Sequence, residues 1–216
     1  MAVITQRETS GKVGFPPQFP PPPGSRGGGG NGGGSESSFP VSSKELTTWL
    51  LLTGIGMLFG GFASAYIVLR GVPAWESVHL PSLVWVNTAI LLFSSVTFEW
   101  ARRAVKRNQL PALRQWLALT GILGIVFVAG QIEVWRKLSA AGLYLASNLH
   151  GSFFYVLSGM HAVHILGGLI ALSFVVRKAW SDKLNSQSFE PLRLCATYWH
   201  FMGGIWILLL LLLVLA

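Results

Sequence analysis

The chain has 216 residues, of which 51% are hydrophobic and only 11% are charged, and its mean hydropathy is +0.53. Soluble domains carry about 25% charged residues, so this composition excludes an ordinary soluble enzyme or binding domain. The formal net charge of +8 does not indicate nucleic-acid binding, because the basic residues lie at the ends of apolar runs, as they do in membrane proteins.

Residues 1–44 form a low-complexity segment. Six prolines lie within residues 16–23 and eight glycines within residues 24–34, and no apolar run typical of a secretory signal is present. Such a segment has too little apolar surface to offset the entropy cost of ordering. We therefore expect a disordered Pro/Gly-rich cytoplasmic tail.

Five apolar runs follow, at about 46–69, 81–101, 114–136, 151–176 and 193–216. A helix needs about 20 apolar residues to cross a hydrocarbon core of about 30 Å, and each run is long enough. The loops between the runs are too short to hold a soluble domain. The sequence therefore predicts an all-α polytopic membrane protein, with a bundle of five transmembrane helices over residues 45–216.

The distribution of Lys and Arg predicts the orientation. The tail, the loop after the second run and the loop after the fourth carry thirteen of the sixteen basic residues, and the other side carries Arg70, Arg136 and Lys137. Basic residues concentrate on the cytoplasmic side of a membrane. We expect a cytoplasmic N-terminus and a C-terminus outside.

A few polar residues lie within or next to the runs. Glu133 precedes Arg136 and Lys137 at helical ion-pair spacing, which indicates an interfacial ion pair. A functional role for Glu133 is the alternative, because a second polar residue, Gln131, lies deeper in the same run. Asn87 is expected to hydrogen-bond between helices as a packing residue.

Three histidines lie inside the predicted bundle. His161 and His164 are three residues apart and share one helix face, and His200 follows Trp199 in the last run. Histidine is the commonest metal ligand, so a metal or haem site is one interpretation. The other is that each ring forms hydrogen bonds within the bundle or to a lipid, since no carboxylate or cysteine lies nearby to complete a ligand set. The single cysteine, Cys195, also excludes an intrachain disulfide, a cysteine-ligated iron–sulfur cluster and a covalent c-type haem.

Three sequence motifs point to a known family. The fourth run contains the series Phe154, Tyr155, Gly159, His161, His164, Gly167 and Gly168, with Ser158 where the family has threonine; the last contains Tyr198, Trp199, His200, Phe201 and Trp206; and the second contains Asn87 and Thr88. In type, spacing and order these resemble subunit III of the haem–copper oxidases, in its shorter five-helix bacterial form. The resemblance covers about residues 45–216.

The resemblance implies an accessory subunit of a respiratory terminal oxidase, a proton-translocating oxidoreductase that reduces O2 to water. Such a subunit has no catalytic residues and binds no metal or haem, because haem and copper belong to partner subunits. It packs on the catalytic oxidase subunit I and other oxidase subunits, holds phospholipids in a cleft between its helices, and supports proton uptake and the stability of the complex during turnover. It resides in the bacterial cytoplasmic (inner) membrane, and the electron donor is either cytochrome c or quinol.

On this interpretation the structural, lipid-cleft or interface candidates are His161, His164, Trp199, His200, Tyr155, Gln131, Glu133 and Asn87. Two positions differ from the family pattern, since Ile55 and Gly203 stand where the family often has acidic residues. A competing hypothesis is a membrane b-type cytochrome that exchanges electrons with quinone, with His161 or His164 and His200 as haem ligands. A small transporter is disfavoured, because no broken helix pair or charged mid-membrane site is visible.

Overall fold

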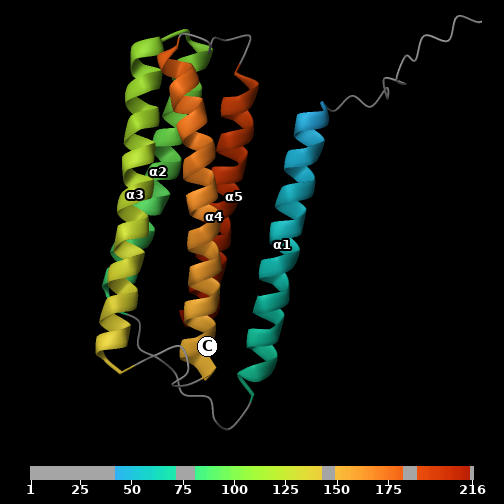
Figure 1. Cartoon of the computed structure of the whole chain (residues 1–216), viewed down its shortest axis with the longest axis vertical. Helices are drawn as coiled ribbons and strands as arrows, with labels where there is room; N and C mark the ends of the chain where they lie inside the picture. The colour runs from blue at the N-terminus through green and yellow to red at the C-terminus, as the bar shows by residue number, and fades with distance from the viewer. Residues whose placement is uncertain (1–41, 72–80, 143–148, 182–188, 215–216) are drawn as a thin grey trace, which may run out of the picture. The chain divides into compact units, whose positions relative to one another are not determined.

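The computed structural model describes residues 42–71, 81–142, 149–181 and 189–214. These residues form five helices and contain no strand: α1 (Ser43–Leu69), α2 (Leu83–Lys106), α3 (Leu110–Ala140), α4 (Leu149–Trp180) and α5 (Glu190–Val214). All five are long and apolar enough to cross a membrane. The predicted all-α class and the five transmembrane helices are confirmed (Figure 1).

The helices differ from the predicted runs at their ends. Helix α1 begins at Ser43, because the Ser42 side chain accepts a hydrogen bond from the Glu45 backbone N–H and caps the helix. Helix α3 begins at Leu110 and has 31 residues, because Pro111 is well placed in a first helical turn. Both helices therefore begin before the predicted apolar runs. Residues 1–41 of the predicted disordered tail lie outside the described residues.

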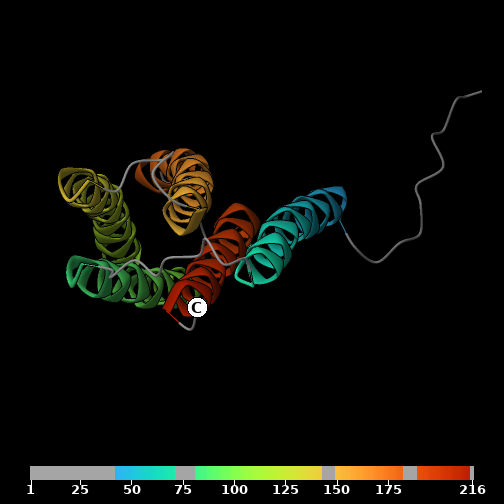
Figure 2. The same ribbon diagram turned by 90° about the horizontal axis from the view of Figure 1, so that it is seen from below.

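Helices α2 to α5 pack as a group, with α3 between α2 and α4 and α5 against both α4 and α2. Helix α1 packs only against α5 and α4 among the described helices. Figures 1 and 2 agree that α1 lies at one edge of the group, beside α5. Helix α1 is thus the least enclosed of the five.

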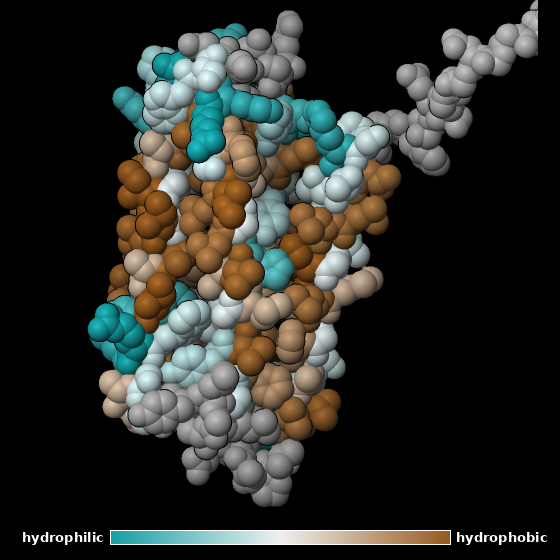
Figure 3. Space-filling model, viewed as in Figure 1, coloured by the Kyte–Doolittle hydropathy of each residue, from teal (hydrophilic) through white to brown (hydrophobic). Residues whose placement is uncertain are grey.

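The interior contains two clusters of buried apolar side chains. One includes Phe59, Phe127 and Trp206, and the other includes Phe98 and Trp199. The outer surface also carries many large apolar side chains, and Figure 3 shows them along the middle of the helices. Apolar side chains on the outside as well as the inside are expected for a bundle surrounded by lipid.

One close approach depends on a glycine in α3. A Cβ atom at Gly124 would lie 2.8 Å from Leu169 and 2.8 Å from Trp199, nearer than carbon atoms can approach. Without a side chain there, α3 can pack closely against α4 and α5. The buried Trp199 indole of α5 occupies the space beside Gly124 that a side chain would need.

Candidate functional site

His161 lies at the centre of the bundle and is completely buried. Its ring centroid is 4.9 Å from that of Trp206, 5.9 Å from Phe127 and 6.3 Å from Phe59. These rings come from α5, α3 and α1, so His161 of α4 has an aromatic neighbour on three other helices. Neither ring nitrogen has a hydrogen-bond partner among the described residues.

Helix α2 contributes polar groups next to this aromatic cluster. The Trp206 indole N–H donates to the Thr88 hydroxyl at 2.9 Å. The Asn87 side-chain amide donates to the Phe127 carbonyl at 3.0 Å and lies 3.5 Å from the Gln131 side-chain oxygen. Asn87 and Gln131 are both buried, and these contacts join α2 to α3.

His164 is only partly buried and has a different environment. Its Nδ1 atom lies 2.7 Å from the Met160 carbonyl of the preceding turn, and its ring is 5.5 Å from the Phe59 ring. Its backbone carbonyl accepts a hydrogen bond of 2.8 Å from the Tyr198 hydroxyl. The two histidines thus share Phe59, while His164 also lies at the contact between α4 and α5.

Trp199 and His200 lie elsewhere in the bundle. The Trp199 indole N–H donates to the Ser94 hydroxyl at 3.0 Å, which joins α5 to α2. The His200 ring is 6.3 Å from Phe98. His161 packs on Trp206, six residues further along α5, which corresponds to about 9 Å along the axis. The structure therefore does not bring His200 together with His161.

Tyr155 lies near the start of α4, and Glu133 lies nearer the end of α3. The Tyr155 hydroxyl donates to the Trp135 carbonyl at 3.2 Å, which joins α4 to α3. Glu133 is half exposed and lies 3.7 Å from Arg136 in the same helix. This is the ion pair expected from the spacing, and it is separate from the buried Gln131.

The histidines are poorly arranged for a metal or a haem. The described residues contain no group of three His, Cys, Asp or Glu side chains close enough to hold a metal ion. Two axial ligands of a haem must bind opposite faces of one iron, whereas His161 and His200 pack against different aromatic residues. The structure therefore does not bring this pair of histidines together as the competing b-type cytochrome hypothesis needs.

A groove of about 670 Å³ lies between α1, α4 and α5. Its walls include Leu51 and Phe174, and Tyr198 and Gly167 line it where α4 meets α5. Lys44 and Lys178 line it as well, and they stand near the first residue of α1 and the last residues of α4. Apolar walls with two amines towards one end are suited to a ligand with an anionic group and apolar chains.

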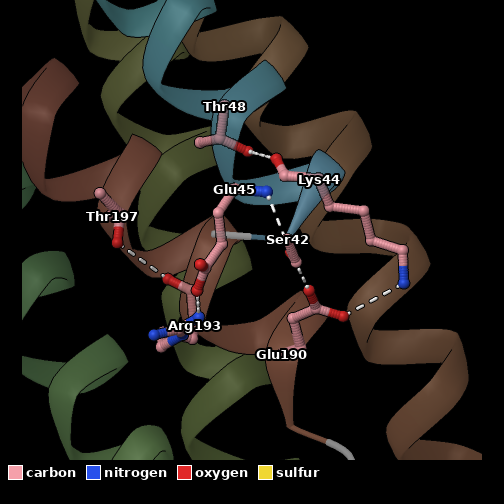
Figure 4. A network of polar contacts seen from close by, with 7 residues as sticks. All are labelled: Ser42, Lys44, Glu45, Thr48, Glu190, Arg193 and Thr197. Carbon is pink, nitrogen blue, oxygen red and sulfur yellow. Dashed lines mark hydrogen bonds and ion pairs between the residues drawn. The ribbon is translucent and has the colours of Figure 1, made fainter. Parts of the chain in front are cut away.

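A polar network beside this groove joins α1 to α5 (Figure 4). Glu190 accepts a hydrogen bond of 2.9 Å from Ser42 and lies 3.1 Å from the Lys44 ammonium group. In a second ion pair the acid, Glu45, belongs to α1 and the base, Arg193, to α5, so each helix supplies one acid and one base. The network fixes the end of α1 where the apolar contact with the bundle is limited.

A family model for cytochrome c oxidase subunit III matches residues 68–215, which include all of α2 to α5. The chain belongs to the cytochrome c oxidase subunit III family. Three curated members show how far the similarity extends. The Thermostichus vulcanus protein is 31% identical over 166 residues, covering 74% of this chain and 81% of that protein. The Synechocystis sp. protein is 33% identical over 169 residues (76% and 71%), and that of Corynebacterium diphtheriae is 31% identical over 158 residues (70% and 77%); all three are named cytochrome c oxidase subunit 3.

The two departures from the subunit III pattern occupy different environments. Ile55 is buried on α1, outside the residues matched by the family model. Gly203 is buried on α5, where a Cβ atom would lie 3.5 Å from the Ser95 hydroxyl of α2. Gly203 therefore faces α2.

Sequence reasoning missed part of this site. Phe127 contacts His161 but belongs to no subunit III motif that we recognised, and an aromatic residue in an apolar run carries no signal of its own. The residues that line the groove were also missed, since Lys44 and Lys178 served only to predict orientation. Their positions at helix ends on the same predicted side of the membrane were the available signal.

Proposed function

We propose that this chain is the accessory subunit III of a respiratory haem–copper oxidase in a bacterial cytoplasmic membrane. It packs on the catalytic subunit I, and haem and copper are held by partner subunits. It has no catalytic residues of its own and supports proton uptake and the stability of the oxidase during O2 reduction. The N-terminus lies in the cytoplasm.

The observation that carries this proposal is the family match across α2 to α5, which contain all three motifs recognised in the sequence. The packing of the histidines supports it. His161 lies among three aromatic rings, His164 lies at the α4–α5 contact, and His200 lies beside Phe98. We assign these histidines, together with Trp199, Asn87, Gln131 and Tyr155, to packing between helices.

Lipid binding belongs to the same proposal. We place a phospholipid in the groove between α1, α4 and α5, with its phosphate near Lys44 and Lys178 and its chains along Leu51 and Phe174. Lys44 is 71% exposed and its ion pair with Glu190 is at the surface, so it can turn towards a phosphate at little cost. The double variant Lys44→Gln/Lys178→Gln is expected to retain less phospholipid through purification than the wild type, measured by lipid mass spectrometry. An unchanged lipid content would place the lipid elsewhere.

The role as an oxidase subunit is tested by purifying the tagged chain from its own membranes. We expect a larger membrane subunit to accompany it, with a reduced-minus-oxidised haem spectrum and O2 consumption in the complex. The chain expressed alone is expected to be colourless. A haem spectrum from the isolated chain would overturn the accessory role and favour the b-type cytochrome.

The electron donor is tested on the same complex. Cytochrome c and quinol are supplied in turn, and O2 consumption identifies the donor. Removing this subunit from the complex is expected to leave initial activity largely intact while shortening the number of turnovers before inactivation. Equal lifetimes with and without the subunit would contradict a stabilising role.

A further inference from the structure

A second groove, of about 350 Å³, lies between the end of α2 and the start of α3. It shares no residue with the groove of α1, α4 and α5. Its lining includes Trp100, Arg103 and Arg107 from α2 and the turn after it, and Gln109 and Trp116 from the start of α3. The turn that joins the two helices is tight, because the Gln109 N–H donates back to the Ala104 carbonyl at 3.0 Å. This hydrogen bond holds the turn that closes one end of the groove.

The two indoles form one wall of this groove. Their ring centroids are 4.6 Å apart, and both rings are only partly buried by the chain. Trp100 lies six residues before the end of α2 at Lys106, which is about 9 Å along the helix. Tryptophan at this depth typically occupies the level between lipid chains and headgroups. The indoles are thus placed at the membrane interface.

The charge of the two arginines is only partly balanced by the described part of the chain, because Arg103 shares the carboxylate that it contacts with a third arginine. Arg103 lies 3.9 Å from Glu99, whose carboxylate is already bound by Arg102 at 2.9 Å. Arg107 forms no ion pair within the described residues. Arg103 and Arg107 are four residues apart, a spacing at which like charges on a helix repel. An anion between the two guanidinium groups would relieve this repulsion.

The chemistry of α2 changes in steps along this one face. Phe93, Val96, Trp100, Arg103 and Arg107 recur at spacings of three and four residues, so they form a continuous stripe. Phe93 and Val96 are each close to half exposed, and the Phe93 ring packs on Trp100. The order is apolar, then interfacial aromatic, then cationic, which is the order of chain, glycerol backbone and phosphate in a lipid.

We propose that this groove is a binding site for one anionic phospholipid, of the phosphatidylglycerol class. Arg103 and Arg107 bind the phosphate, since guanidinium groups pair with phosphate oxygens through two hydrogen bonds. Gln109 lies beside the headgroup, and the acyl chains lie along Trp100, Val96 and Phe93. Basic pockets between transmembrane helices are suited to anionic headgroups, and the sequence predicts this end of the bundle to be cytoplasmic. The inference does not depend on assembly with an oxidase.

The test uses the purified full-length chain and native mass spectrometry, with phosphatidylglycerol or phosphatidylcholine added at increasing concentration. The wild type is expected to bind phosphatidylglycerol well in preference to phosphatidylcholine. A basic residue next to an anionic lipid contributes about five-fold in affinity, so Arg103→Gln/Arg107→Gln should weaken the affinity by about 30-fold. The matched control is Arg136→Gln/Lys137→Gln, which removes two exposed charges from the far end of α3 and should leave the affinity unchanged.

Two further variants keep the result interpretable. Arg103→Lys/Arg107→Lys retains the charges and should recover most of the affinity, which a general folding defect would not allow. Trp100→Leu/Trp116→Leu should weaken binding of lipid but not of inorganic phosphate. Thermal unfolding of each variant without added lipid shows whether the bundle is intact, and single arginine variants replace the double variant if it is not.

Several results would overturn the proposal. Equal affinities for the two lipids would show that the headgroup charge is not recognised. Displacement of the lipid by millimolar inorganic phosphate with no contribution from the tryptophans would identify a site for free phosphate. Photo-crosslinking from position 107 in native membranes to a polypeptide, with no lipid adduct, would show that a protein segment occupies the groove.

Discussion

Asn87 and Gly130 show how closely α2 and α3 pack at the level of single atoms. A Cβ atom at Gly130 would lie 2.4 Å from the Asn87 side-chain oxygen, closer than any real contact of this kind. The same Asn87 amide donates to the Phe127 carbonyl of α3. The absence of a side chain at position 130 therefore allows the buried Asn87 to reach its partner.

Gly130→Ala is expected to destabilise the bundle. The added methyl group would displace Asn87, and overpacking of this kind costs about 1–3 kcal/mol. That exceeds the roughly 0.5–1 kcal/mol by which alanine is favoured over glycine inside a helix. Thermal unfolding in detergent, followed by tryptophan fluorescence, measures the loss. The control is Gly159→Ala, since nothing lies within 4 Å of a Cβ atom there, and similar melting temperatures for the two variants would refute the predicted contact.

His161 gives a second prediction at this scale. Its nitrogens have no partner among the described residues, so its aromatic contacts should account for its contribution to stability. His161→Phe conserves shape and is expected to change the free energy of unfolding by less than about 1.5 kcal/mol. His161→Ala leaves a cavity among three rings and should cost about 3–5 kcal/mol, as truncation of buried aromatic residues does. If the phenylalanine variant unfolds as readily as the alanine variant, the nitrogens must bind a group that these contacts do not include.

Among the elements, α1 differs most from the others in how it is held. It contacts only α4 and α5, and many of its large side chains are exposed, including Trp49, Leu50, Met57 and Val68. At its start, the ion pair of Glu45 with Arg193 and the contacts of Glu190 with Ser42 and Lys44 join it to α5. Polar contacts at the end of α1 therefore complement its limited apolar packing.

A double-mutant cycle on Glu45→Gln and Arg193→Gln measures this connection. Partly exposed ion pairs contribute about 0.2–1 kcal/mol, so we expect a coupling within that range, determined from thermal unfolding. It should shrink when the salt concentration is raised from about 0.05 M to about 0.5 M, because ions screen exposed charges. The control cycle uses Glu133 and Arg136, which are 3.7 Å apart within α3 and join no second helix. A coupling no larger than the control and insensitive to salt would show that the pair does not hold α1.

The number and approximate position of the helices could be predicted from the sequence, because an apolar run of about 20 residues in a membrane forms a helix that satisfies its own backbone hydrogen bonds. Their ends could not, since Ser42 and Pro111 extend α1 and α3 beyond the apolar residues. The shared face of His161 and His164 was predictable from their spacing, and both rings do contact Phe59. The sequence does not predict which of the two histidines is fully buried. Nor does it predict that Trp206, and not His200, lies beside His161, because this depends on the relative positions of neighbouring helices along their axes.

On the scale of the whole molecule, one end of each described helix lies at the same end of the bundle. The start of α1, the end of α2, the start of α3, the end of α4 and the start of α5 lie together there (Figure 1), and hydrophilic side chains gather at this end (Figure 3). This end contains the arginines of the α2–α3 groove and the lysines of the α1–α4–α5 groove. Both proposed lipid phosphates would therefore lie in one leaflet.

Topology fusions test which leaflet that is. Thirteen of the sixteen basic residues lie on the predicted cytoplasmic side, so the C-terminus is expected outside the cytoplasm. Alkaline phosphatase fused after Ala216 should be active, and a green fluorescent protein at the same place should be dark. The reverse pair of results would invert the orientation and move both anionic-lipid grooves to the outer leaflet.

The contacts of α1 also set an order of events during synthesis. The ribosome produces α1 first, yet its described neighbours are the fourth and fifth helices, so it must wait in the bilayer without them while α2 and α3 pair. Phe59 then reaches the rings of His161 and His164 only once α4 has inserted. A nascent chain that stops after α3 therefore has a first helix that lacks both of its described neighbours.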